Sequence, residues 1–234
     1  VRGLAEAVKK QEGGLRVVAP AMERASREGD LPLSFAQQRL WFIHQLEPAS
    51  TTYNVPRAVR LVGELNVAAL EESLRQIVQR HEVLRTRYEV KGQQAVQVIE
   101  EEAGVELRVW DVSELEECRR EEMAGEVVRQ ESGRGFDLEK GPVIRAGLVR
   151  LSGEEHVLMV VMHHIASDGW STGVLVKEFS ELYESNREGR QTGLGELEIQ
   201  YADYAVWQRG WLSGEVLDEQ MEYWKEQLRE APVL

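Results

Sequence analysis

Apolar residues recur at helical spacing in several stretches of the chain. The clearest stripe follows Asn66, whose side chain can cap a helix, and its members share one helical face: Leu70, Leu74, Ile77, Val78 and His81. A second stripe follows Ser34, which is also a suitable N-cap: Phe35, Leu40, Ile43 and Leu46. Both patterns predict amphipathic helices with one buried face.

Three further helices are predicted in the second half of the chain. Ser113 and Glu116 have the spacing of a capping box, which predicts a helix that runs to about residue 130. The apolar period is helical again over 171–188, and Gly189 provides a stop. A last helix is predicted over 215–229.

Strand-like segments lie between these helices. They are rich in β-branched and aromatic residues and are bounded by turn residues: Val55–Val62, Leu84–Val90, Ala95–Ile99, Val105–Trp110, Pro142–Leu151 and Glu155–Ile165. The last two are joined by Ser152 and Gly153 and predict a hairpin. Because strands and helices are interspersed, we expect an α/β (α+β) sandwich with a mixed sheet flanked by helices, and neither an all-α nor an all-β fold.

The start of the chain differs from the rest. Residues 1–10 have a helical pattern but are too few to form a stable helix alone. Residues 11–31 contain several glycines and prolines without a lasting period, which is typical of a linker. Folded sequence is therefore expected to begin near Pro32.

Composition narrows the protein class. The 234 residues carry 28 Lys+Arg and 41 Asp+Glu, a formal net charge of −13, which disfavours duplex nucleic acid as a partner. Cys118 is the only cysteine, so neither an internal disulfide nor a multi-cysteine zinc site can form. No run approaches the ~20 apolar residues of a membrane span, and the start does not resemble a signal peptide. We expect a cytoplasmic protein without a membrane partner.

Candidate chemistry is concentrated at one strand end. The apolar run 157–162 leads directly into His163 and His164, two of the five histidines. Successive strand side chains point to opposite faces, so one ring should face a cleft and the other the interior. Catalysis competes here with a structural histidine pair. A metal site with Asp168 is disfavoured because the two rings diverge.

The loop that follows carries residues suited to shaping a site. Asp168 lies four residues after His164, close enough to fix the loop or a ring. Gly169 allows a close backbone approach or a positive φ. Trp170 would shield the site from water. Asp168 and Gly169 together are also an ordinary turn signal.

Four ordered motifs carry a family resemblance: SFAQQRLWFI at 34–43, RHEVLRTRY at 80–88, MHHIASDGWS at 162–171 and YADYAVW at 201–207. With them the chain resembles the condensation domain of non-ribosomal peptide synthetases, of which HHxxxDG is the signature. This resemblance implies a V-shaped pair of lobes similar to chloramphenicol acetyltransferase, with the active site in a tunnel between them.

The resemblance also implies a division of the chain. Residues 1–10 would be the end of an upstream carrier domain, followed by a linker over 11–31. Residues 32–190 would form the N-terminal lobe, and 191–234 the crossover segment toward an absent C-terminal lobe. A complete domain of this family is about twice this length, so we expect the isolated half to be inactive.

Site roles follow from the resemblance by position. His164 would point into the tunnel beside the thioester and the amine, and His163 would face inward as a structural residue. Asp168 would hold the loop through an ion pair with Arg85. Gly169 would let a backbone N–H approach the reacting group.

The resemblance further implies the substrates and partners. The reaction is peptide-bond formation between a donor acyl or peptidyl thioester and an acceptor amino acid, both bound to carrier domains through phosphopantetheine, with no cofactor bound directly. The form around SFAQQRLWFIHQLEP and YNVP is similar to domains that accept an L-configured donor. Expected partners are the donor and acceptor carrier domains, the C-terminal lobe and an adjacent adenylation domain. The alternatives are a coenzyme-A-dependent acyltransferase and a non-catalytic carrier-docking lobe.

Overall fold

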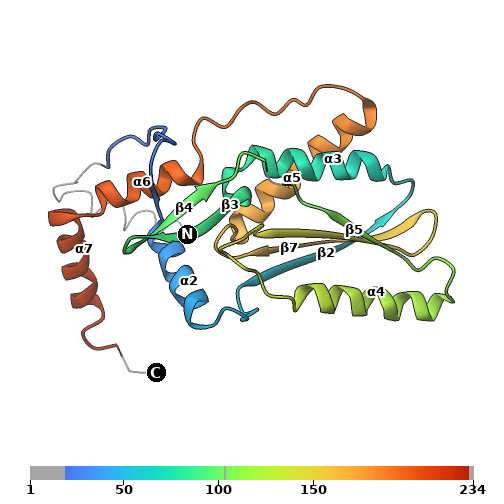
Figure 1. The fold of residues 1–234 in the computed structure, drawn as a ribbon, viewed down its shortest axis with the longest axis horizontal. Coiled ribbons are helices and arrows are strands. Elements are labelled where there is room, and N and C mark those ends of the chain that lie inside the picture. The colour runs from blue at the N-terminus through green and yellow to red at the C-terminus, as the bar shows by residue number, and fades with distance from the viewer. Residues whose placement is uncertain (1–18, 103, 232–234) are drawn as a thin grey trace, which may run out of the picture.

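The computed structural model describes residues 19–102 and 104–231 (Figure 1). The helix predicted for residues 1–10 lies outside the described residues. In chain order the elements are β1 (Leu31–Pro32), α2 (Phe35–Leu46), β2 (Asn54–Val62), α3 (Val67–Arg80), the 3₁₀ helix η1 (Glu82–Arg85), β3 (Thr86–Lys91), β4 (Gln94–Ile99), β5 (Leu107–Asp111), α4 (Glu117–Ser132), β6 (Ile144–Arg150), β7 (Glu155–His163), α5 (Gly169–Glu188), α6 (Tyr201–Trp211) and α7 (Gly214–Gln227). The predicted mixture of strands and helices is confirmed.

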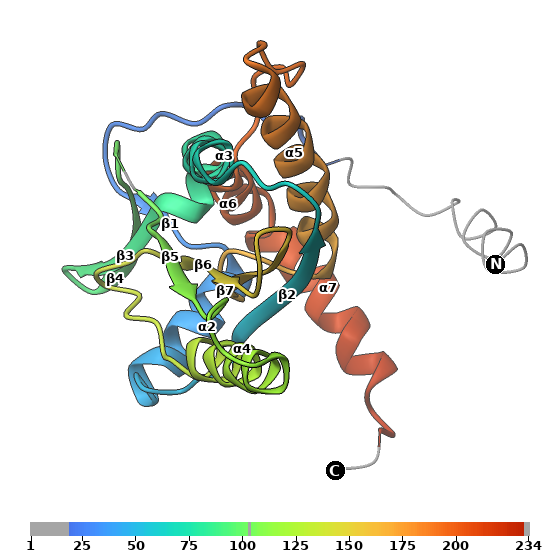
Figure 2. The ribbon, with the colours of Figure 1, turned by 90° about the vertical axis from the view of Figure 1, so that its right-hand side faces the viewer.

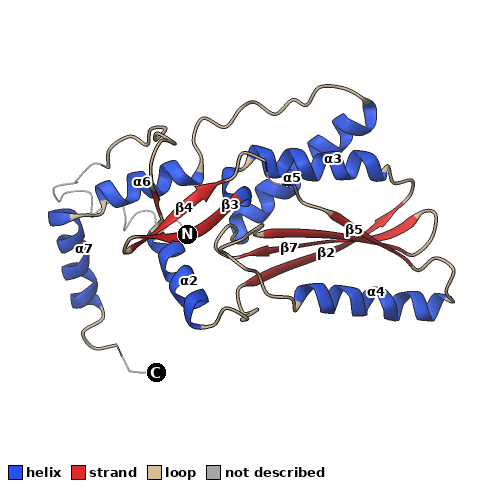
Figure 3. Ribbon diagram, viewed as in Figure 1, coloured by secondary structure: helices blue, strands red, loops and turns tan. Residues whose placement is uncertain are grey.

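The strands form two sheets (Figure 3). The larger sheet has the order β2-β7-β6-β5; only the β5–β6 pair is parallel, so the sheet is mixed. The smaller sheet has the order β1-β4-β3 and is antiparallel. The hairpin predicted from the Ser152-Gly153 turn is confirmed as the β6–β7 pair.

Helices cover both faces of the larger sheet (Figure 2). On one face, Leu70 and Leu74 of α3 pack with Leu158 of β7, and α5 lies beside α3. On the other face, Val127 of α4 packs with Met159 of β7. Even-numbered and odd-numbered side chains of β7 therefore enter different hydrophobic clusters, as the strand pleat requires.

The helix signals at Ser34 and Asn66 are confirmed. Ser34 and Gln37 form a capping box at the start of α2, and the Asn66 side chain accepts from Ala69 N at the start of α3. The predicted stripe of α3 is buried from Leu70 to Val78. His81, the last member of that stripe, is the C-cap rather than a helical residue.

The capping box predicted at Ser113 is wrong. Helix α4 begins only at Glu117, and its N-cap Glu116 makes no side-chain cap bond. Ser113 instead donates through its backbone N–H and its hydroxyl to the Asp111 carboxylate, at 3.0 and 2.6 Å. This local turn competes with helix initiation, a known tendency of short polar side chains.

Helix α6 packs against β1 and η1, far from it in sequence. Trp207 Nε1 donates to Pro20 O at 2.7 Å, and Arg209 Nε donates to Leu33 O at 2.7 Å. Folded sequence was expected to begin near Pro32. The contact of Trp207 with Pro20 shows that packing against α6 begins earlier in the chain. Helix α7 extends away from this packing and has no buried residue (Figures 1 and 2).

Candidate functional site

The site predicted around the two histidines lies where β7 ends. The backbone N–H of His163 donates to Val143 O at 2.9 Å, and the backbone N–H of His164 donates to Tyr53 O at 2.8 Å. These acceptors precede β6 and β2, the strands on either side of β7. The central position of β7 therefore fixes both residues at the exit of the strand.

His163 is the inward-facing histidine and is only 4% exposed. Its Nδ1 accepts from Ile165 N at 3.0 Å, and the Phe136 ring meets it edge-on with 5.9 Å between centroids. Burial lowers the pKa of His163 to about 4, so the ring is neutral at pH 7. The ring is therefore packed inside the protein and accepts a hydrogen bond from its own loop.

His164 faces outward, and its side chain is exposed. Its Nδ1 lies 2.5 Å from Ser167 O. A carbonyl oxygen can only accept, so Nδ1 carries the proton in this bond and, in the neutral ring, Nε2 keeps a free lone pair. The arrangement leaves Nε2 able to accept a proton or a hydrogen bond from outside the protein.

Asp168 caps helix α5. Its carboxylate accepts from Ser171 N at 2.7 Å, and the Ser171 hydroxyl accepts from Asp168 N, also at 2.7 Å. The hydrogen bond from Ser171 N is the largest cause that lowers the pKa of Asp168 below its ordinary value. Helix α5 consequently starts at Gly169, two residues earlier than its apolar period predicts.

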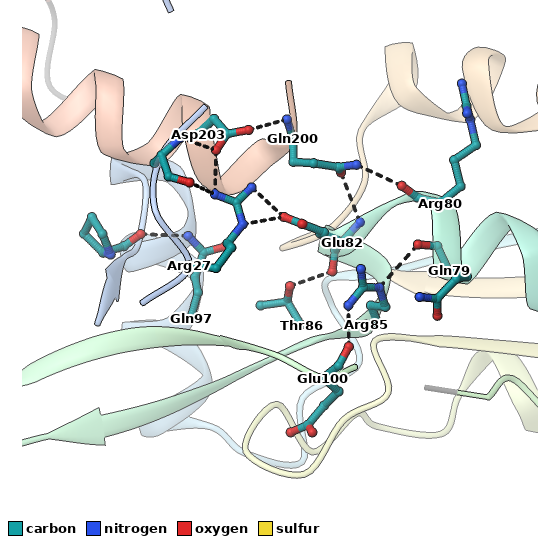
Figure 4. A network of polar contacts seen from close by, with 12 residues as sticks. Arg27, Gln79, Arg80, Glu82, Arg85, Thr86, Gln97, Glu100, Gln200 and Asp203 are labelled. Atoms are coloured by element: carbon teal, nitrogen blue, oxygen red, sulfur yellow. Dashed lines mark hydrogen bonds and ion pairs between the residues drawn. The ribbon is translucent and has the colours of Figure 1, made fainter. Parts of the chain in front are cut away.

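The predicted ion pair between Asp168 and Arg85 is wrong. Arg85 ends η1, and its guanidinium donates to the backbone carbonyls of Glu100 and, at 3.4 Å, of Gln79 (Figure 4). Arg85 thus ties η1 to the ends of β4 and α3. Asp168 is satisfied by the first turn of its own helix, so neither residue requires the other.

Gly169 and Trp170 follow Asp168 at the start of α5. Gly169 does not have a positive φ, and a Cβ built on it meets nothing within 4 Å. The backbone beside it is open, so the close approach of another group stays a prediction. Trp170 is 85% exposed and shields nothing in the described part of the chain.

A buried polar network was not predicted from the sequence (Figure 4). Arg27 Nη1 lies 2.6 Å from the Asp203 carboxylate, and Arg27 Nη2 lies 2.7 Å from the Glu82 carboxylate. Burial alone would raise the pKa of Asp203, but the bonds from Arg27 and from backbone N–H groups lower it further than burial raises it. Glu82 and Asp203 belong to two of the four family motifs, and this was the signal in the sequence that could have pointed to them. Arg27, in contrast, lies in the predicted linker.

Side chains that could ligate a metal do not gather at one place in the described residues. Within residues 19–102 and 104–231, no three His, Cys, Asp or Glu side chains are grouped to hold a metal ion. None of the helices in those ranges combines the length and the apolar character needed to cross a bilayer.

Comparison with curated proteins identifies relatives whose similarity extends over nearly the whole of this chain. One of the linear gramicidin synthase proteins of Brevibacillus parabrevis is 48% identical over 214 residues, which cover 92% of this chain and 4% of that protein. Surfactin synthase subunit 1 of Bacillus subtilis (strain 168) is 40% identical over 235 residues, which cover 100% of this chain and 6% of that protein. The chain therefore spans only a small part of these relatives.

Solved structures share the fold. The teicoplanin X-domain in complex with OxyB superimposes with a TM-score of 0.82 at 32% identity, covering 93% of this chain and 48% of that one. The starter condensation domain of rhizomide synthetase has a TM-score of 0.76 at 21% identity, covering 88% of this chain and 51% of that one, and shows the fold alone. The chain spans about half the length of these structures. Residues 27–234 match the family described as Condensation domain, and with this match and these relatives the chain belongs to the condensation domain family of non-ribosomal peptide synthetases.

Proposed function

We propose that this chain is the N-terminal half of a domain that joins a donor acyl or peptidyl thioester to the amine of an acceptor amino acid, both carried on phosphopantetheine. Residues 32–190 would form the lobe and 191–234 the crossover to the second lobe. The observation that carries the proposal is His164: an exposed imidazole at a central strand end, with Nδ1 held by Ser167 O and Nε2 free.

The chemistry of the amine defines what His164 can contribute. An α-amine with a pKa of about 7.7–8.0 is already partly neutral near pH 7.5, so removing its proton before attack gains little. After nitrogen has bonded to the carbonyl carbon it becomes a strongly acidic ammonium. The free Nε2 of His164 is suited to orient the amine and then take this proton.

Positioning and charge stabilisation complete the proposal. Holding amine and thioester in line is worth about 7–11 kcal/mol in well-oriented reactions, which exceeds the gain expected from proton transfer alone. The backbone N–H of Gly169 starts α5, and helix N-terminal N–H groups favour negative charge. We assign this N–H to the developing oxyanion, with the open space beside Gly169 in support.

Partners follow from the same proposal. The donor and acceptor carrier domains deliver the thioesters, the second lobe supplies the opposite wall of the tunnel, and an adenylation domain lies next in the assembly. The donor is L-configured. No cofactor is bound by the lobe itself. The cytoplasm is the proposed location.

The experiment that tests the proposal is His164→Ala in a condensation domain completed with its second lobe. Amide formation between carrier-bound substrates should fall by about 10²-fold or more, while the thermal unfolding midpoint stays unchanged because the ring is exposed. Lys177→Ala, an exposed change in α5, is the matched control and should keep full activity. Undiminished amide formation by His164→Ala would remove the residue from the mechanism.

One comparison favours a second function, in which this lobe binds a carrier domain or an enzyme without catalysing a reaction. The teicoplanin X-domain is described in complex with OxyB, so this fold also serves as a binding module. Binding of carrier partners without turnover in the completed domain would support docking. Transfer from acyl-coenzyme A without a carrier would instead support the coenzyme-A-dependent alternative.

A further inference from the structure

Residues 20–27, which we call the strap, lie against α6 and η1 although they form neither helix nor strand. Most of their side chains are exposed. At one end of the strap, Trp207 Nε1 donates to Pro20 O at 2.7 Å. At the other end, Arg27 Nη1 donates to the Asp203 carboxylate at 2.6 Å. Side chains of α6 therefore hold the strap at both of its ends.

Buried carboxylates bind the strap at its Arg27 end (Figure 4). The side chain of Asp203 is fully buried, and that of Glu82 is 10% exposed. Asp203 also accepts from Ala25 N at 2.9 Å, and Nε and Nη2 of Arg27 both donate to Glu82 Oε2, at 3.0 and 2.7 Å. Buried carboxylates that contact one cation are left uncompensated when it is removed. The strap thus supplies the positive charge that this site requires.

The residues that hold the strap belong to two of the family motifs. Glu82 lies in RHEVLRTRY, and Asp203 and Trp207 lie in YADYAVW. None of the three takes part in the amide chemistry proposed for His164. Their contacts with the strap give these motif residues a role outside that chemistry.

We propose that the strap anchors an upstream carrier domain to the lobe, so that the carrier's tether ends at Pro20 rather than at Leu31. The inference rests on the proposed function and deepens it. The family resemblance implies that residues 1–10 end the carrier and that a linker follows. Nine linker residues precede Pro20 and extend over roughly 30 Å at most, whereas twenty precede Leu31 and extend over roughly 70 Å. The anchor removes more than half of the tether.

A shorter tether should favour the carrier that belongs to the same chain. The effective concentration of a tethered group falls roughly as the −3/2 power of the tether length. A tether of twenty residues in place of nine should therefore lower the effective concentration of the donor by about threefold. A carrier supplied as a separate protein has no tether, so the strap should not affect it.

Two insertions test the anchor in a completed domain that is joined to its upstream carrier. Nine Gly/Ser residues between Val18 and Ala19 lengthen the tether before the anchor and should slow single-turnover amide formation by about threefold. The same nine residues between Gly29 and Asp30 lie after the anchor and should leave the rate unchanged. Equal effects of the two insertions, or a larger effect of the second, would overturn the inference.

Arg27→Lys tests which group holds the strap. It keeps the charge, but one nitrogen cannot reproduce the guanidinium fork that reaches both carboxylates. In the 234-residue chain, hydrogen exchange of the Ala25 amide, which donates to Asp203, should become at least about tenfold faster. Arg24→Lys, an exposed change in the strap, is the matched control and should keep the exchange rate of the parent. Parent-like exchange in Arg27→Lys would contradict the proposal.

A separately supplied donor carrier distinguishes the anchor from damage to the lobe. With that carrier, Arg27→Lys and both insertions should form the amide at the parent rate, whereas His164→Ala should lose activity with either carrier. An equal loss with both carriers in Arg27→Lys would assign the network to stability alone and overturn the inference.

The two proposals fail in different ways. Amide formation that depends on His164 but responds equally to both insertions would overturn the anchor and leave the proposed function standing. Amide formation that persists fully in His164→Ala would overturn the proposed mechanism, and the comparison of the two insertions would still decide the anchor.

Discussion

Asp168 and Ser171 bind each other reciprocally across the first turn of α5, each side chain accepting from the other's backbone N–H at 2.7 Å. The residue before this box, Ser167, supplies the carbonyl that holds His164 Nδ1. The aspartate of the HHxxxDG signature therefore fixes the loop through a helix cap, and the loop in turn orients the imidazole.

Asp168→Ala should lower the free energy of unfolding by about 1 kcal/mol, the usual cost of losing an N-cap side chain. Asp168→Asn should lower the free energy of unfolding by less than half as much, because the asparagine amide oxygen can still accept from Ser171 N. Urea denaturation of the three proteins measures both values. Equal losses for alanine and asparagine would show that the charge, rather than the cap, stabilises the loop.

His163 should make stability depend on pH. Its pKa of about 4 in the folded protein lies below the ordinary value of about 6.5, so the unfolded chain binds the proton first. The stabilisation is complete above pH 6.5 and is lost as the pH falls from 6.5 to 4, by about 3 kcal/mol in total. Unfolding free energies measured across that window should show this loss.

His163→Asn provides the comparison. It removes the titrating ring and keeps an oxygen that can accept from Ile165 N, so the parent should lose about 3 kcal/mol more than the variant between pH 6.5 and 4. The same pH dependence in both proteins would assign the effect to other groups, of which His44 and His156 also have pKa values lowered by burial.

Arg27→Met should destabilise the protein by about 2 kcal/mol. The change leaves the fully buried Asp203 carboxylate and the nearby Glu82 carboxylate without their shared cation, and breaking buried pairs costs about 3–5 kcal/mol when neither partner is exposed. Arg27 keeps some exposure, which reduces the loss. The measurement is the unfolding midpoint in urea.

Lys140→Met is the control for that change. Lys140 pairs with Asp137 on the surface and is 83% exposed, so its loss should leave the unfolding midpoint in urea close to that of the parent. Adding Asp203→Asn to Arg27→Met should recover part of the stability by removing the unpaired charge. A further loss in the double variant would contradict the assigned role of the network.

Gly169→Ala should leave stability within about 0.5 kcal/mol of the parent, because the added Cβ meets nothing and φ is not positive. Gly147→Ala is the contrasting control: its Cβ would lie 2.6 Å from Trp110 Cζ3, an overlap that should cost about 1–3 kcal/mol. The measurement is the thermal unfolding midpoint of each variant compared with that of the parent. A large loss for Gly169→Ala would show that the backbone there is not open.

Local periodicity predicted most of the fold. The stripe from Leu70 to Val78, the Ser34 cap and the β6–β7 hairpin each depend on residues close in sequence, and each is present. The divergence of His163 and His164 was equally predictable, because it follows from the strand pleat alone.

Long-range polar partners could not be predicted in this way. Arg85 binds backbone carbonyls, which no residue pattern identifies, and Asp168 binds within its own helix turn. The partners of Arg27 lie 55 and 176 positions away and include a helix whose packing depends on the whole fold. Ser113 is not a cap because its backbone N–H and hydroxyl both donate to Asp111, two residues earlier, in a local turn that ends before the helix begins.

The packing of α6 against β1 has a consequence for synthesis. A ribosome adds about 5–20 residues per second, so the segment around Arg27 waits roughly 9–35 s before Asp203 is made. Until then Arg27 lacks the Asp203 carboxylate, and β1 lacks the helix that packs on it. The first-made stretch of this lobe is therefore among the last to be fixed in place, and a nascent chain halted before residue 201 should leave it open to proteases.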